Sequence, residues 1–252
     1  MSGPGVGVKD GLPDIIWCPV PAWWMELEGD AGRFELEAFQ IAKYPLTQAQ
    51  YRLFVEAEDG YANSKWWRGL PERYYQDPGR QIPAYPNHPA VNVDWMEAMA
   101  YCRWLSHKLG HTVRLPTEWE WQQAACFGNP NIAYPWGPDW DGRRANSYES
   151  QLNRTLAVGL YAQDWREDRP LDMAGNVWEW CLNEYGKPMP TADIVWQDHA
   201  ERVVRGGGWD NRPGFLRCAK SWLQSRAIWP AVQRSLGRVV GQSRDGAGSP
   251  YG

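Results

Sequence analysis

Three short stretches rich in apolar residues near the start of the chain have the pattern of strands. These stretches are IIWCPV at 15–20, WWMELE at 23–28 and RFELEAFQIAKY at 33–44. In the last one, Phe34, Leu36 and Ala38 alternate with charged neighbours, which is the period of two of a half-buried strand. We therefore predict two or three short strands before residue 45. The Gly-rich residues 1–12 ahead of them are predicted to be disordered.

Three later segments carry the signals of short amphipathic helices. Each begins with a Thr or Asp followed three residues later by Gln or Glu, the pattern of a capping box. The pairs are Thr47 with Gln50, Asp94 with Glu97, and Thr117 with Glu120. The helices should end near Gly60, Gly110 and Gly128, because glycine readily adopts the left-handed conformation that closes a helix. Strands followed by helices, with no regular alternation, favour an α+β fold.

The composition adds that this fold is loop-rich. The chain has 252 residues, with 18 Trp, 12 Tyr, 25 Gly and 20 Pro. Glycine and proline set turns, while the aromatic side chains bury a large area per residue. We therefore expect few long elements and a core packed largely by aromatic rings.

Charge and cysteine content narrow the classes of function. The net charge of −4 does not favour a nucleic-acid ligand, and no apolar run reaches the roughly 18 residues needed to span a bilayer. No signal peptide is visible, so we expect a cytoplasmic location. The five cysteines are scattered without a CxxC pair, so we expect buried thiols in place of disulfides or a zinc site.

Five stretches, taken in order, carry a resemblance to a known family. They are FQIAKYPLTQAQYRLFVEA, HPAVNVDWMEAMAYCRWLSHKLGHTVRLPTEWEWQQAA, YPWGPDWDGRRAN, LDMAGNVWEW and RVVRGGGWDN…RCA. Together they resemble the formylglycine-generating-enzyme (sulfatase-modifying factor) family. The resemblance implies a C-type-lectin-like fold with little regular secondary structure. It predicts a single domain over residues 13–240 and a flexible tail over 241–252.

The same resemblance implies a structural calcium site around the DMAGNVWEW motif. Carried over to this sequence, Asp172 and Glu179 would supply carboxylates, while Gly175 and Val177 would supply backbone oxygens. Ca²⁺ prefers such oxygen ligands. The alternative is a turn held by Asp and Asn side chains without metal. For the family's second calcium site, Asn146 is in place, but the residues after it offer no clear acidic match.

The resemblance does not extend to the catalytic cysteines. Catalytic members hold copper through two cysteines just after the RGGSW-type motif, and here these positions fall at Asn211 and Leu216. Asn and Leu cannot replace thiolates as ligands of Cu(I), so we expect no copper and no formylglycine formation. Another catalytic branch uses an iron triad of the HxxxHxE type, which this sequence does not contain.

A second branch that the sequence resembles is the variable proteins of diversity-generating retroelements. In these proteins, the segment after RGGSW is diversified and runs to a terminal GFRV-like strand. Here the segment ends in LGRVV, which lacks the Phe. We therefore predict a non-catalytic protein that binds an unknown protein or small molecule through residues 210–234. The predicted ligand-binding residues are Asp210, Asn211, Arg212, Phe215, Lys220, Trp222, Gln224, Arg226, Trp229, Gln233 and Arg234.

Two other functions remain open at this point. One is an oxidoreductase of the family with altered or lost chemistry, and the other is a regulatory or scaffold module. The tryptophans of the 210–234 segment could also belong to the core, in which case only its charged residues would face solvent.

Overall fold

The computed structural model describes residues 3–26, 33–70, 77–82, 84–129, 132–161, 168–186, 201–224, 234–235 and 237–241. Its helices are α1 (Gln48–Glu56), α2 (Trp95–Leu109) and α3 (Glu118–Cys126), with short 3-10 turns η1 (Ser64–Trp67), η2 (Tyr148–Ser150) and η3 (Pro213–Phe215). The first strands are β1 (Val8–Lys9), β2 (Leu12–Pro13), β3 (Trp17–Val20), β4 (Trp23–Glu26), β5 (Arg33–Leu36), β6 (Phe39–Ala42) and β7 (Val113–Arg114). The later strands are β8 (Trp178–Glu184), β9 (Arg202–Arg205), β10 (Ser221–Gln224), β11 (Arg234–Ser235) and β12 (Val240–Gly241).

All three predicted helices are present with the predicted N-caps. Both halves of the capping box form at Thr47, Asp94 and Thr117. Gly110 closes α2 in the left-handed conformation at a φ of 71°. Gly128 does not close α3, because Phe127 takes the left-handed position one residue earlier. Helix α1 ends at Glu56, before the predicted Gly60, with Ala57 as its C-cap. The helix N-termini therefore follow local side-chain to backbone hydrogen bonds that the sequence already shows, whereas the C-termini follow them less closely.

Two four-stranded sheets organise the chain. One has the order β3-β6-β12-β7 and the other β10-β9-β8-β11. The strand pairs are antiparallel apart from β8 with β11, whose strands run parallel. β12 lies between β6 and β7, so residues near the end of the described chain join strands from its first half.

Residues 33–44 form two strands where the alternation predicted one. β5 pairs with β4, whereas β6 pairs with β3. The chain leaves the strand conformation between them, at residues 37–38, and Ala38 is exposed. The period of two was therefore a correct sign of strand but gave no information about the change of partner, which depends on β3 and β4.

The N-terminal residues differ from the expectation of disorder. β1 pairs with β2, the backbone N–H of Gly5 donates to Asp14 at 2.8 Å, and Val6 is buried. The hydroxyl of Thr47 also donates to the carbonyl of Val6 at 2.8 Å. The segment is ordered because its backbone groups find partners in α1 and β2, which a glycine count cannot reveal.

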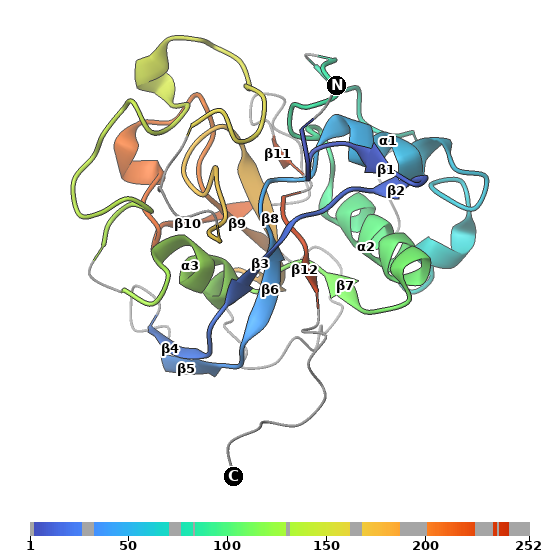
Figure 1. The fold of residues 1–252 in the computed structure, drawn as a ribbon, viewed down its shortest axis with the longest axis horizontal. Coiled ribbons are helices and arrows are strands. Elements are labelled where there is room, and N and C mark those ends of the chain that lie inside the picture. Colours follow the sequence, from blue (N-terminus) through green and yellow to red (C-terminus); the bar gives the residue numbers. More distant parts are fainter. Residues whose placement is uncertain are drawn as a thin grey trace.

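The core consists of three clusters. The first joins α1 and α2 through rings such as Phe54, Tyr101 and Trp104, and the second lies between α3 and the β3–β6 pair. Figure 1 shows α1 and α2 together on one side of the central strands and α3 on the other. The third and smallest cluster joins the 132–161 loops to the segment after β9. Among the described residues, no helix is long and apolar enough to cross a membrane.

Candidate ligand-binding surface

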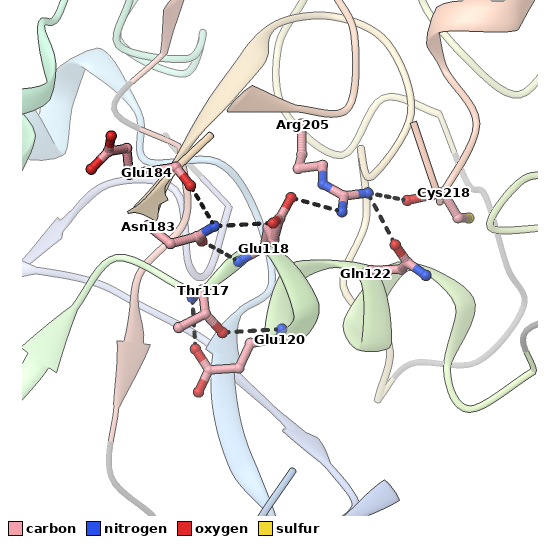
Figure 2. Close-up of polar contacts among 8 residues, drawn as sticks. All are labelled: Thr117, Glu118, Glu120, Gln122, Asn183, Glu184, Arg205 and Cys218. Carbon is pink, nitrogen blue, oxygen red and sulfur yellow. Dashed lines mark hydrogen bonds and ion pairs between the residues drawn. The ribbon is translucent and has the colours of Figure 1, made fainter. Parts of the chain in front are cut away.

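A buried ion pair fixes the start of the RGGGW motif. Arg205, the last residue of β9, lies 3.2 Å from Glu118 of α3, and both side chains are almost fully buried. Its guanidinium also donates to Gln122 at 3.1 Å and to the carbonyl of Cys218 at 3.0 Å (Figure 2). Glu118 in turn accepts from Asn183 of β8 at 3.1 Å. Arg205 therefore ties β9 to α3, and also holds the backbone at Cys218, within the predicted 210–234 segment.

The glycines of the motif pack against the DMAGN turn. The N–H of Gly175 donates to the carbonyl of Gly206 at 2.8 Å, and the N–H of Trp209 donates to the carbonyl of Asn176 at 3.1 Å. Gly175 has a φ of +81°, and a Cβ there would lie 2.3 Å from the carbonyl oxygen of Asn146. Glycine is required at this position for both its backbone conformation and the close approach.

Two asparagine side chains extend this frame to the neighbouring loop. The Asn176 side chain accepts from the N–H of Leu156 at 2.8 Å and donates to the carbonyl of the same residue at 3.2 Å. Asn146 donates to the Asn176 side chain at 3.1 Å and to the carbonyl of Arg154 at 2.9 Å. Hydrogen bonds of these two buried amides, and not β-sheet pairing, thus hold residues 146–156 beside the DMAGN turn.

The first three predicted contact residues, which follow the RGGGW motif, differ in how far they are exposed. The Asn211 side chain accepts from the N–H of Gly208 at 2.8 Å, and its carbonyl accepts from the N–H of Tyr148 at 3.0 Å. Asp210 is half-buried, and burial raises the pKa of its carboxyl. Arg212 is exposed, and its guanidinium lies 5.7 Å from the ring centre of Tyr148. Asn211 is therefore a structural residue, whereas Arg212 is available to a ligand.

The remainder of the segment alternates between buried anchors and outward side chains. Leu216 and Cys218 are buried, while Arg217 between them is exposed. Phe215 is half-buried and lies edge-to-face against Trp222, with ring centres 5.5 Å apart. Trp222 is 46% exposed, so it does not belong to the core. The anchors hold η3 and β10 in place and leave the Phe215–Trp222 pair at the surface.

An aromatic group from the YPWGPDW stretch adjoins this segment. Tyr134 stacks on Trp136 at 5.5 Å and meets Trp140 at 5.1 Å, and the three rings pack with Leu216 and Phe215 in the third cluster. The hydroxyl of Tyr134 donates to the carbonyl of Pro213 at 3.4 Å. Neither this group nor Tyr148 nor Arg217 was among the predicted site residues. The sequence signal for the three rings is the cluster of Trp and Tyr between turn residues at 134–140.

The structure covers part of the predicted site. Lys220 is half-buried, and only the backbones of Gln224 and Arg234 are described, opposite Arg202 and Trp178. Arg226, Trp229 and Gln233 lie outside the described residues. We use "contact surface" below for Tyr148, Arg212, Phe215, Arg217 and Trp222.

Three of the four residues predicted to bind calcium already use their oxygens in hydrogen bonds or an ion pair. The Glu179 carboxylate is fully buried and lies 3.1 Å from Arg238, and it also accepts from the indole N–H of Trp121 at 3.1 Å. Asp172 accepts from the N–H of Gly159 at 2.5 Å, and burial raises its pKa to about 6. The carbonyl of Gly175 accepts from the N–H of Val177 at 2.9 Å. A Ca²⁺ ion held by these residues would have to share the Glu179 carboxylate with the Arg238 guanidinium.

The five cysteines are free and buried. Burial raises the pKa of Cys18 and Cys126 to about 11 and that of Cys102 to about 12. Burial also raises the pKa of Cys181 and Cys218 well above the ordinary value. Burial therefore favours the protonated form of these thiols at neutral pH.

These features define a C-type-lectin-like frame of the formylglycine-generating-enzyme type, with a loop surface above a glycine turn. The family pattern described as "Sulfatase-modifying factor enzyme 1-like domain" matches residues 20–230. The chain belongs to this family.

Individual relatives carry different names. The protein named serine/threonine-protein kinase pkn1 of Chlamydia caviae is 32% identical over 203 residues, which cover 73% of this chain and 30% of that protein. The formylglycine-generating enzyme of Streptomyces coelicolor is 33% identical over 193 residues, covering 65% of this chain and 58% of the enzyme. The chain thus spans less than two thirds of either relative. The solved Treponema denticola variable protein 1 shares the fold, with a TM-score of 0.65 at 18% identity, covering 90% of this chain and 95% of that one.

Proposed function

We propose that this protein binds a ligand without catalysis, through the contact surface. The main support is how side chains are divided between buried and exposed positions after β9. Leu216 and Cys218 are buried, whereas Arg212, Arg217 and Trp222 face outward from the same short segment. A segment whose anchors are buried can present a fixed set of side chains, which lowers the entropy cost of binding.

The chemistry of the exposed side chains also supports recognition. Tryptophan and arginine are the residue types that most often anchor interfaces, and the contact surface presents one exposed Trp and two exposed Arg. The neighbouring Tyr134, Trp136 and Trp140 add rings that are packed against the frame. A ligand with a flat or apolar group and a negative charge suits this combination best.

The positions of the family's copper cysteines support the absence of catalysis. Leu216 is fully buried against the glycine turn, where a Cβ on Gly207 would already lie 3.0 Å from its side chain. The Asn211 side chain is engaged by the N–H of Gly208. Both residues serve the frame, so we infer that the chain does not bind copper or oxidise a substrate cysteine.

The two inferences can be tested separately. Binding is tested by screening the purified protein against glycan arrays and a displayed peptide library. Each ligand found is then measured with Arg212→Ala and Trp222→Ala. We expect each substitution to weaken binding by about tenfold or more. The matched control is Trp23→Ala, because Trp23 is also an exposed strand tryptophan. Equal affinity in Trp222→Ala, Arg212→Ala and Trp23→Ala would show that the ligand binds elsewhere.

Catalysis is tested by incubating the protein with Cu(I) and cysteine-containing peptides and reading the products by mass spectrometry. We expect no aldehyde and no stoichiometric copper. Aldehyde formation, or tight copper binding, would instead establish the oxidoreductase function.

We further propose that the segment is diversified, as in the variable proteins of retroelements. Such diversification requires buried residues that keep the fold and outward-facing residues that can change, and the segment after β9 has both kinds. The test is genomic: a neighbouring reverse transcriptase, and a near-copy of this coding segment that differs only at adenines. A genome with neither feature would overturn this part of the proposal and leave the binding function standing.

A further inference from the structure

A second buried arginine lies in a shell of oxygen atoms at the junction of three segments. Arg238 precedes β12 and is fully buried, and its Nε lies 3.2 Å and 3.1 Å from the two oxygens of Glu179. Its Nη1 donates to the carbonyls of Ala42 at 3.3 Å and Lys43 at 2.6 Å. Its Nη2 donates to the carbonyl of Leu171. We call these five oxygens, from Glu179, Ala42, Lys43 and Leu171, the oxygen cage.

The cage has the chemistry of a site for a hard cation. It combines a carboxylate with backbone carbonyls, the oxygen types that Ca²⁺ favours. Asp172, next to Leu171, adds a buried carboxyl in the same region. Without a cation, the buried Glu179 carboxylate would keep the indole N–H of Trp121 and the backbone N–H of Arg238 as donors, but no positive charge within the cage. Isolated buried charges are strongly unfavourable, so this cage requires a positive group.

The backbone places the arginine there with little freedom. The N–H of Leu46 donates to the carbonyl of Gly237, and the N–H of Ala42 donates to the carbonyl of Val239, both at 2.9 Å. Gly237 has a φ of +74°, and a Cβ there would lie 3.1 Å from the Cβ of Glu179. Residues 237–239 are therefore held against β6 and β8, which places the Arg238 side chain in the cage.

We propose that the Arg238 guanidinium is the resident cation of the oxygen cage, so that the protein maintains this junction without Ca²⁺. A planar guanidinium can donate to a carboxylate and to several carbonyls at once. These are the same oxygens that a bound metal ion would coordinate. The two cations exclude each other, because both need the Glu179 oxygens. The junction adjoins the start of the RGGGW motif, because Glu179 of β8 pairs in register with Arg205 of β9. This proposal does not depend on the binding function.

The first experiment uses the natural chain. Its Tm is measured by circular dichroism in excess EDTA and in excess CaCl₂, and Tb³⁺ is titrated with excitation through tryptophan. We expect the same Tm in both solutions and no saturable Tb³⁺ luminescence. A Tm that falls on adding EDTA would overturn the proposal. Saturable Tb³⁺ luminescence would also overturn it if Glu179→Gln abolishes the signal.

The second experiment opens the cage with Arg238→Ala. We expect a Tm lower by roughly 10 °C, since one partner of a buried pair is removed. Added Ca²⁺ should raise this Tm in a concentration-dependent way, and Tb³⁺ should bind with a single saturable phase. The double variant Arg238→Ala with Glu179→Gln should show neither response, because the anionic ligand is gone.

Arg238→Lys is the matched control. It keeps a positive charge in the cage, so it should fold with a Tm between the other two and show no response to Ca²⁺. If Arg238→Ala shows the same Tm with and without Ca²⁺, the cage is not a cation site and the proposal fails. The proposal also fails if Arg238→Ala is unfolded both with and without Ca²⁺ while Arg238→Lys folds. Folding of Arg238→Ala only when Ca²⁺ is present would support the proposal strongly.

Discussion

Removing one partner of the buried ion pair between Arg205 and Glu118 should lower the stability strongly, and Arg205→Met tests this. The substitution keeps a long apolar stem but removes the charge and three hydrogen bonds, to Glu118, Gln122 and the carbonyl of Cys218. The Glu118 side chain is 8% exposed and would be left without its cation. Removing one partner of a buried pair costs about 3–5 kcal/mol, because the remaining charge cannot return to water.

The assay is urea denaturation together with thermal melting. A loss of about 3–5 kcal/mol corresponds to a fall in Tm of roughly 6–20 °C for a domain of this size. Because the pair is buried, the loss should persist at high salt, where exposed pairs are screened. The matched control is Arg143→Met, which breaks an ion pair to Asp141 whose arginine side chain is 90% exposed. Its Tm should stay that of the natural protein.

A double-mutant cycle separates charge from packing. If the charge left in place is what destabilises Arg205→Met, adding Glu118→Gln should recover part of the lost stability. A loss of less than about 1 kcal/mol in Arg205→Met would refute the reasoning, because a loss that small is typical of solvent-exposed ion pairs. A loss that disappears at high salt would refute it as well.

Four further predictions test the frame, the contact surface and the buried cysteines. Gly175→Ala should destabilise by more than about 3 kcal/mol, because its Cβ meets the Asn146 carbonyl. Gly110→Ala, with a φ of +71° but open space, should cost about 1 kcal/mol by chemical denaturation. Trp222→Ala should cost under about 1 kcal/mol, whereas Trp121→Ala, fully buried, should cost about 3–5 kcal/mol; equal losses would place Trp222 in the core. Ellman's reagent should leave the native thiols unreacted and label all five after denaturation, so a thiol that reacts in the native protein would contradict their burial.

The parts of the fold that were predictable from sequence depend on local contacts. A capping box joins residues three apart, so Thr47, Asp94 and Thr117 announce their helices without any knowledge of the fold. The strand partners were not predictable in this way. Residues 33–44 look like one continuous strand, but they divide into two because β4 pairs with the first half and β3 pairs with the second.

The candidate surface shows the same division. Residue types alone predicted Arg212, Phe215 and Trp222 as contact residues; the structure shows Arg212 and Trp222 exposed and Phe215 half-buried. Asn211 was included for the same reason, yet its amide holds the N–H of Gly208. Arg217 and Tyr148 were missed, because exposure within a loop depends on which neighbours pack inward.

By itself, the sequence determined the three helices, the family and the absence of cysteines at residues 211 and 216. These follow from short-range patterns and from residue identity. The tertiary structure alone decided that Trp222 faces outward while Leu216 is buried, and that Arg238 lies against Glu179, 59 positions away in the chain. The reason is physical: a buried charge is tolerated only beside its partner, and no local pattern shows which distant segment supplies that partner.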